Sequence, residues 1–224
     1  MPHPAVVLLS GGQDSTTCLV WAKKRFSDIY TLAFDYGQRH RIELDAAANI
    51  AKRAGVKQHK VLPVASLSAL GGDALTGDAP VPTGLTEGSE IPATFVPGRN
   101  LLFLTLAAAW AWRLGVSDLV TGVCQTDYSG YPDCREGTMR SMQQALTLGL
   151  DKPMRIHTPL MFLTKAQSVT LAREIGALDL LAYSHTCYQG LVPPCGTCPA
   201  CLLRARGFAE AHIADPLLTR LGKA

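Results

Sequence analysis

A glycine-containing hexapeptide near the start of the sequence constrains the fold more than any other segment. Its residues are Ser10, Gly11, Gly12, Gln13, Asp14 and Ser15. An apolar run at 5–9 precedes it and a helix-like stretch at 16–26 follows it. A strand, a glycine turn and a helix start in this order leave unpaired N–H groups and the positive end of a helix dipole at the turn, where glycine lets an anion approach the backbone. The segment therefore predicts a phosphate-binding loop after the first strand.

Strand-like and helix-like segments alternate along the first 62 residues. Strand-like runs at 5–9, 29–34 and 57–62 are separated by helix-like runs at 15–26 and 42–54. Strands separated by helices of this length predict βαβ units and a parallel sheet. Further along, the sequence predicts helices at 100–114, 136–148, 165–175 and 199–213, a strand at 118–122 and an extended segment at 156–160.

These patterns predict an α/β protein with an open parallel sheet and helices on both faces. We expect the main domain to span residues 1–182, and a loop insertion rich in glycine and proline interrupts the alternation at 63–97. From residue 183 the chain is rich in cysteine, proline and glycine, which predicts a small C-terminal helical region at 183–224. With 224 residues, the chain is long enough to bury a full hydrophobic core.

The charge and hydropathy of the chain exclude some classes of partner. Its formal net charge is +3, and its densest basic spots, at 23–25 and 39–41, are short. Such a balance gives weak support for binding a large nucleic acid, and we expect no nucleic-acid partner. The sequence has no visible secretory signal and no apolar run of membrane-spanning length, so we expect a cytoplasmic protein that does not enter a membrane.

Four cysteines lie within fifteen residues near the C-terminus: Cys187, Cys195, Cys198 and Cys201. Proline and glycine between them favour turns, which allow the thiolates to converge. In a reducing compartment, clustered cysteines indicate a metal before a disulfide. Four thiolates complete the tetrahedral shell of Zn²⁺ and leave no open position, so the pattern favours a structural zinc site. An iron–sulfur cluster and buried cysteines without a metal are the alternatives.

Several polar segments follow the predicted strands. They lie at 34–38, 95–100, 127–135 and 158–165, and the third has the sequence Asp-Tyr-Ser-Gly-Tyr-Pro-Asp-Cys-Arg. Because open α/β sheets bind ligands at the carboxyl ends of their strands, these segments predict a ligand site at that edge.

Together these motifs resemble a known enzyme family. The hexapeptide resembles the Ser-Gly-Gly-x-Asp-Ser loop of the PP-loop ATP pyrophosphatases, and the stretch at 128–135 and the four-cysteine tail are more specific. From residue 6 to residue 201, the chain resembles the 7-cyano-7-deazaguanine synthase family of the queuosine-precursor pathway. The resemblance implies an adenine nucleotide alpha hydrolase-like fold, a structural Zn²⁺ in the tail and a homodimer.

The resemblance also implies a reaction. An ATP-dependent ligase converts 7-carboxy-7-deazaguanine and ammonia to 7-cyano-7-deazaguanine through adenylated intermediates, and it releases AMP and pyrophosphate. No glutaminase motif is visible, so free ammonia is the expected nitrogen source. Within the superfamily, the alternative is a tRNA-modifying enzyme, either a thiolase or a lysidine-type ligase. A non-catalytic zinc-binding adaptor is an alternative from another class.

Residues of this sequence match the needs of that reaction. The six residues of the hexapeptide would hold the ATP phosphates, and Asp14 and Ser15 would act on the phosphates or on Mg²⁺ at the loop-to-helix junction. Arg99 and Lys165 are expected to stabilise charge on the phosphates or on the substrate carboxylate.

We expect the loop at 127–135 to form the deazaguanine pocket. Tyr128 and Tyr131 can stack on a purine-like ring, and Asp133 can accept hydrogen bonds from the ring N–H and the exocyclic amine. Arg135 can bind the carboxylate of the substrate. The alternative is a turn whose aromatic side chains only pack.

Overall fold

The computed structural model describes residues 3–38, 41–70, 75, 83–84, 91–126 and 130–223. Within these residues, a five-stranded parallel sheet has the order β3-β2-β1-β4-β5. The strands are β1 (Ala5–Leu8), β2 (Ile29–Asp35), β3 (Gln58–Pro63), β4 (Asp118–Val120) and β5 (Arg155–His157). The predicted open parallel sheet is confirmed, and because the strands are parallel, their carboxyl ends share one edge.

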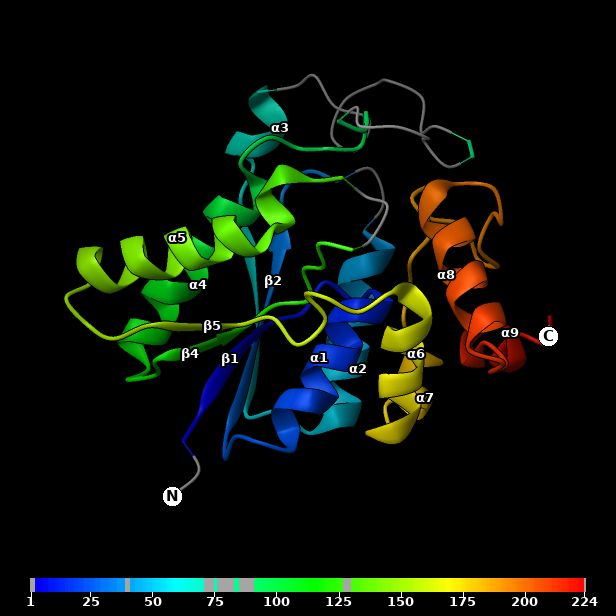
Figure 1. The fold of residues 1–224 in the computed structure, drawn as a ribbon, viewed down its shortest axis with the longest axis horizontal. Helices are drawn as coiled ribbons and strands as arrows, with labels where there is room; N and C mark the ends of the chain where they lie inside the picture. Colours follow the sequence, from blue (N-terminus) through cyan, green and yellow to red (C-terminus); the bar gives the residue numbers. More distant parts are fainter. Residues whose placement is uncertain are drawn as a thin grey trace.

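Helices cover both faces of this sheet (Figure 1). Val6 of β1 points to one face, where it is buried in a cluster with Leu104 and Ala107. Val7 points to the other face and is buried with Leu19 and Ile50. Alternate burial of this kind is expected for a strand that is covered on both sides. The covering helices are α4 (Arg99–Arg113) and α5 (Glu136–Gly149) on the first face, and α1 (Gln13–Lys23) and α2 (Ile42–Ala54) on the second.

Local sequence signals set several helix ends. Gly55 takes the left-handed conformation (φ 64°) and ends α2 at the expected residue. Thr164 and Gln167 form a capping box at the start of α6 (Lys165–Glu174), where each side chain accepts a hydrogen bond from the backbone N–H of the other. Helix α1 begins at Gln13 and, unlike α6, has no side chain that caps its N-terminus. Its first N–H groups are therefore left for a ligand or solvent.

Some short elements were not predicted. They are α3 (Ser66–Leu70), α7 (Leu178–Leu181), α9 (Pro216–Arg220) and a 3₁₀ turn, η1 (Pro132–Cys134). Helices of four or five residues are not stable alone, so they depend on tertiary contacts that a local pattern does not reveal. Helix α3 lies within the predicted insertion at 63–97, and much of that segment lies outside the described residues.

The C-terminal region packs against the rest of the chain through α6. Phe208 of α8 (Pro199–Glu210) is buried in one cluster with Val169 and Leu181. Arg204 of α8 is 4% exposed and forms an ion pair with Asp215, with an Nε–Oδ2 distance of 2.6 Å. Because the two parts share a hydrophobic cluster, their division at residue 182 stays a prediction. Among the described residues, the helices are too short or too polar to span a lipid bilayer.

A charged network lies at the amino end of β4, away from the phosphate-binding loop. The buried carboxylate of Asp118 accepts two hydrogen bonds from Arg155, at 2.8 and 2.7 Å, and contacts Nε2 of His157 at 2.7 Å and Nε2 of His3 at 2.9 Å. Burial acts to raise the pKa of Asp118, but the hydrogen bonds from Arg155 and His157 outweigh it and hold this pKa below its usual value.

We expect Asp118→Asn to lower the free energy of unfolding by about 1–3 kcal/mol at pH 7, because the half-exposed Arg155 loses its charged acceptor. A depressed carboxyl pKa contributes stability above the pKa of the unfolded chain and loses it as the pH falls. The free energy of unfolding, measured with urea, should therefore decrease more for the wild type than for the variant when the pH is lowered from 7 to below 4. Equal stabilities at pH 7 would contradict the role of this network.

Candidate active site and metal centre

A cavity of 320 Å³ opens at the carboxyl edge of the sheet. Its volume lies within the range of about 300–1,000 Å³ that is usual for small-molecule sites. The predicted nucleotide-binding, catalytic and substrate-binding residues that line it are Ser10, Gly12, Gln13, Asp14, Ser15, Arg99, Tyr131 and Lys165, and the predicted metal ligand Cys187 lines it as well. The structure thus brings together the loop after β1, the start of α4 and the start of α6, which are far apart in the sequence.

Hydroxyl groups organise the loop after β1. The Oγ atoms of Ser10 and Ser15 lie 3.0 Å apart, and Ser15 Oγ accepts a hydrogen bond from the Ser10 N–H at 3.2 Å. Thr16 Oγ1 donates to the carbonyl oxygen of Gly12 at 2.7 Å. These bonds hold the turn in one conformation before a ligand arrives, which reduces the cost of ordering it on binding.

Gly11 allows helix α2 to lie directly against this loop. Its φ is 85°, and a Cβ atom there would lie 2.4 Å from the carbonyl oxygen of Glu43 and 2.8 Å from the backbone nitrogen of Ala47. On the other side, the carbonyl oxygen of Gly11 accepts a hydrogen bond from the His185 N–H at 2.9 Å. The loop is therefore fixed between α2 and the segment that leads to the cysteines.

Asp14 and Lys165 form an ion pair at the loop end of the cavity. Lys165 Nζ lies 2.9 Å from Asp14 Oδ2. The stem of Lys165 packs against Gly207 of α8, where a Cβ atom would come within 2.5 Å of its Cγ. Asp14 Oδ1 and Gln13 Nε2 are buried and have no hydrogen-bond partner in the described structure. Unpaired buried polar atoms are costly, so their presence beside a cavity indicates a polar ligand there.

Aromatic side chains surround Arg99 at the other end of the cavity. Its guanidinium carbon lies 5.7 Å from the ring centre of Tyr36 and 5.9 Å from that of Tyr131. Phe34 and Phe103 stack nearby, with ring centres 4.0 Å apart. Burial acts to lower the pKa of Arg99, but the surrounding tyrosines and Asp133 outweigh it and raise this pKa. Arg99 is therefore a permanent cation in an aromatic surrounding, suited to a flat anionic ligand.

The predicted substrate loop is only partly brought to the cavity. Tyr131 lines it, and its hydroxyl lies 2.6 Å from Thr94 Oγ1. Asp133 is buried and accepts a hydrogen bond from the Asn100 N–H at 3.1 Å, so one carboxylate oxygen already binds the start of α4. Arg135 is exposed and is not among the residues that line the cavity. Tyr128 lies outside the described residues.

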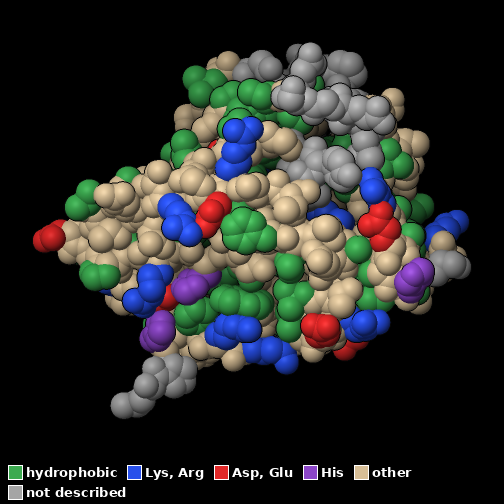
Figure 2. Space-filling view, in the orientation of Figure 1, with side chains coloured by type: hydrophobic (Ala, Val, Ile, Leu, Met, Phe, Trp, Pro, Cys, Tyr) green, Lys and Arg blue, Asp and Glu red, His purple; other side chains and the backbone are tan. Residues whose placement is uncertain are grey.

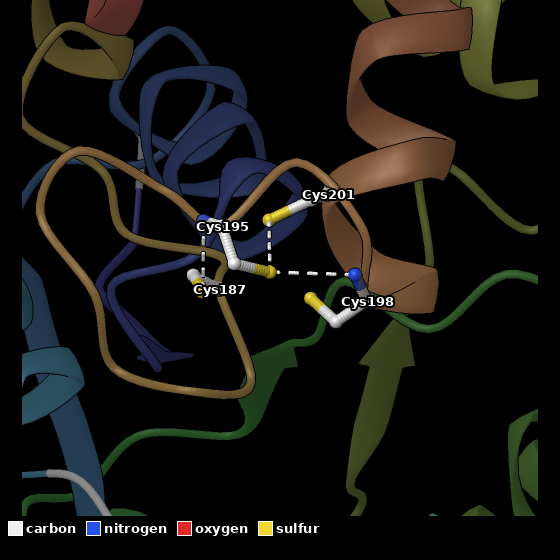
Figure 3. A group of neighbouring side chains, drawn as sticks. All are labelled: Cys187, Cys195, Cys198 and Cys201. Carbon is white, nitrogen blue, oxygen red and sulfur yellow. Dashed lines mark hydrogen bonds between the residues drawn. The ribbon is translucent and has the colours of Figure 1, made fainter. Parts of the chain in front are cut away.

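The four predicted cysteine ligands converge at the start of α8 (Figure 3). Their sulfur atoms all lie within 4.8 Å of one another, and Cys195 and Cys201 are 3.8 Å apart. The hydrogen bond from Cys201 lowers the pKa of Cys198 to about 5, against the effect of burial. With metal–sulfur bonds of about 2.3 Å, tetrahedral geometry requires sulfur separations close to the 3.8 Å between Cys195 and Cys201. The group therefore fits a closed zinc site.

Comparisons with known proteins agree with this geometry. The family model described as "Queuosine biosynthesis protein QueC" matches residues 4–212. The chain belongs to this family. A 7-cyano-7-deazaguanine synthase from Laribacter hongkongensis is 62% identical over 221 residues, which cover 98% of this chain and 96% of the relative. One from Chromobacterium violaceum is 58% identical over 219 residues, which cover 96% and 93%. The predicted family is confirmed.

Two solved structures share the fold of this QueC-family chain. A predicted subunit of a tRNA methyltransferase from Methanocaldococcus jannaschii has a TM-score of 0.50 at 19% identity, and the match covers 77% of this chain and 75% of that one. A 4-thiouridine synthetase, solved with RNA and ATP, has a TM-score of 0.52 at 16% identity, and the match covers 99% of this chain and 53% of that one. At these identities the likeness supports the fold alone.

The cavity of this QueC-family chain is also lined by polar residues that were not among the predicted site residues, and three of them lie close to the predicted motifs. These three are Tyr36, Glu43 and Tyr188. Tyr36 lies in the polar segment at 34–38, and the Gln38 side chain closes the turn after β2 by accepting a hydrogen bond from the Tyr36 N–H at 2.9 Å. Glu43 lies in the first turn of α2, and Tyr188 follows the cysteine ligand Cys187. Their positions next to the motifs indicate that they lie near the site. The direction of each side chain depends on tertiary packing and could not be predicted from the sequence.

Proposed function

We propose that this protein makes 7-cyano-7-deazaguanine from 7-carboxy-7-deazaguanine, ammonia and ATP, and that one cavity carries out both adenylations. The family and the two relatives named as 7-cyano-7-deazaguanine synthases support the reaction. The observation that carries the assignment to this cavity is that its two ends differ in chemistry. One end holds unpaired polar atoms on the phosphate-binding loop, and the other holds Arg99 among aromatic rings.

The chemistry requires two activations at the same carbon. The first ATP converts the substrate carboxylate to an acyl adenylate, and ammonia displaces AMP to give an amide. A second ATP adenylates the amide oxygen, and loss of AMP leaves the nitrile. In both rounds the nucleotide phosphates must lie at one place and the deazaguanine ring at another, which matches the two ends of the cavity.

At the phosphate end, Gly11 and Gly12 give close access to the backbone, and the uncapped N-terminus of α1 favours negative charge. Lys165 places an ammonium beside Asp14, where charge develops on the leaving pyrophosphate. Asp14 Oδ1 is the buried unpaired oxygen that would contact Mg²⁺ bound with ATP. When bound, Mg²⁺ would neutralise charge on the leaving pyrophosphate.

At the ring end, Tyr131 and Tyr36 flank Arg99 and can pack on the faces of a deazaguanine ring. Arg99 can pair with the carboxylate before its activation. It stays a prediction that the Asp133 carboxylate accepts hydrogen bonds from ring N–H groups. Contacts of the substrate with Tyr128 and Arg135 also stay predictions. Arg135 is exposed and is not among the residues that line the cavity, which favours Arg99 as the candidate for the carboxylate contact.

Zinc held by Cys187, Cys195, Cys198 and Cys201 would have a structural role in this proposal. Four protein ligands leave no position for a substrate. The cluster lies next to the cavity, since Cys187 and Tyr188 line it. We also expect the protein to form a homodimer and to be located in the cytoplasm. Among the described residues on the face shown in Figure 2, basic and acidic side chains are interspersed, and they form no continuous basic surface for a nucleic acid.

We expect the purified protein to release two AMP and two pyrophosphate for each nitrile formed, when supplied with 7-carboxy-7-deazaguanine, Mg²⁺-ATP and ammonium. Mass spectrometry of the deazaguanine products and chromatography of the nucleotides would measure this ratio. Release of ADP and phosphate would overturn the proposal. Nucleotide cleavage that depends on tRNA instead of on the deazaguanine would favour a tRNA-modifying enzyme.

A further inference from the structure

The cavity holds a second carboxylate, Glu43, which the roles above leave unused. Glu43 is the second residue of α2 and lines the cavity. Within the described part of the chain, no hydrogen bond or ion pair joins its carboxylate to another group. Asp14 differs, because it is already paired with Lys165. A half-buried acid without a partner is costly to keep charged, so its presence in a cavity wall calls for an explanation.

The backbone of Glu43 is fixed against the phosphate-binding loop. The close approach of its carbonyl oxygen to Gly11 leaves no room for even one methyl group between them. The charged and titratable groups that face its side chain from neighbouring elements are Arg99 of α4, Tyr36 after β2 and Tyr188 of the cysteine segment. Glu43 therefore lies between the loop, where the phosphates would bind, and the aromatic end, where the ring would bind.

The reacting carbon of the substrate must occupy this intermediate position. It joins the deazaguanine ring on one side to an oxygen that carries AMP on the other. Conversion of an amide to a nitrile also removes both protons from the amide nitrogen. A proton acceptor is therefore needed beside the bond that links the ring to the adenylate.

We propose that the Glu43 carboxylate accepts the last of these protons when the nitrile forms. This inference rests on the proposed function. In that step the N–H bond of the adenylated amide breaks, and its proton passes to a carboxylate oxygen of Glu43. The electron pair left on nitrogen forms the third carbon–nitrogen bond. The carbon–oxygen bond breaks with its electron pair going to the oxygen that departs on AMP, and Glu43 later returns its proton to water.

Proton affinity supports this choice among the groups of the cavity. Burial raises the pKa of Glu43 to about 7, against the charge of Arg99, which lowers it. A base with a pKa near the working pH is the most effective one. Burial also raises the pKa of the Cys134 thiol to about 12 and raises that of the Tyr188 phenol, so neither is ionised at neutral pH. Nε2 of His185 lies 3.2 Å from the carbonyl oxygen of Cys187 and is already engaged.

The test compares wild type with Glu43→Gln, which keeps the shape of the side chain and removes the base. A quenched time course would follow carboxylate, amide and nitrile by mass spectrometry. We expect the variant to form amide and the first AMP at a rate within about threefold of wild type, and to form nitrile about 100-fold more slowly, because general bases contribute about 10²- to 10⁴-fold. The amide should accumulate.

The pH profile separates a base from a structural residue. For wild type, the rate of nitrile formation from the amide should rise with pH through an apparent pKa near 7, because the base must be ionised. Glu43→Gln should lose this dependence, and Glu43→Asp should retain it at a reduced rate. Asp45→Asn, an exposed acid in the same first turn of α2, serves as the matched control and should behave as wild type.

The outcomes distinguish the two levels of the proposal. Nitrile formation by Glu43→Gln at the wild-type rate, with the same pH profile, would overturn the role of Glu43 and leave the proposed function intact. Absence of both amide and nitrile with the wild type would refute the proposed function itself. If Glu43→Gln does not fold, Glu43→Asp decides, because a displaced base should still cause the amide to accumulate and an unchanged ratio of amide to nitrile would reject the role.

Discussion

Asp14→Asn is expected to slow pyrophosphate release at least about 100-fold, which is the size of effect seen when one aligned hydrogen-bonding group is removed from a catalytic site. The substitution keeps the size of the side chain and its place in the first turn of α1. It removes the negative charge that pairs with Lys165 at 2.9 Å and changes the buried Oδ1 that has no partner in the protein. The rate of ATP–pyrophosphate exchange in the presence of 7-carboxy-7-deazaguanine would measure the effect.

Asp118→Asn is a suitable control for this experiment. It also removes one carboxylate from an ion pair, but at the opposite edge of the sheet. We expect it to lower stability and to leave the exchange rate unchanged below its melting temperature. Near-normal exchange in Asp14→Asn, with a normal melting temperature, would place the nucleotide site elsewhere.

The parts of this molecule that could be predicted from sequence are those that local chemistry determines. The hexapeptide forms a loop after β1 because glycine and hydroxyl residues set its turn within six positions. Helix α2 has the predicted bounds because Gly55 ends it. The four cysteines converge because their spacing is short and rich in turn-forming residues. Each of these signals lies within a few residues of the feature that it predicts.

The parts that could not be predicted depend on how distant elements approach one another. Gly11 reads locally as an anion-binding glycine, but in the fold it also makes room for the backbone of Glu43. Asp133 reads as a free acceptor for the substrate, but one of its oxygens binds the Asn100 N–H at the start of α4. Arg135 lies one residue after the buried turn and is exposed. A one-residue difference in a loop reverses the direction of a side chain, and no periodic pattern records it.

Cys198→Ser is expected to reduce bound zinc from about one per chain to well below one, and to lower the melting temperature in the same preparation. Cys198 is fully buried and precedes the first residue of α8, so its loss opens the closed ligand set at the point where the helix begins. Zinc binding supplies folding free energy to small regions of this kind. A loss of about 3 kcal/mol would lower the melting temperature of a chain of this size by about 6–12 °C.

Cys18→Ser is the matched control, because Cys18 is equally buried and lies outside the cluster. It should retain full zinc by plasma mass spectrometry. Full zinc in Cys198→Ser, or iron and sulfide with a visible absorption band in the wild type, would contradict a four-thiolate zinc site and revive the iron–sulfur alternative.

Loss of the metal should also weaken ATP binding, because the cysteine segment supports the phosphate-binding loop. The His185 N–H donates to the carbonyl oxygen of Gly11 at 2.9 Å, two residues before the first cysteine ligand. When the cluster opens, this support becomes mobile and the loop must be ordered by the nucleotide at a cost in affinity. The KM for ATP of the folded fraction of Cys198→Ser should therefore rise, while in Cys18→Ser it should match that of wild type.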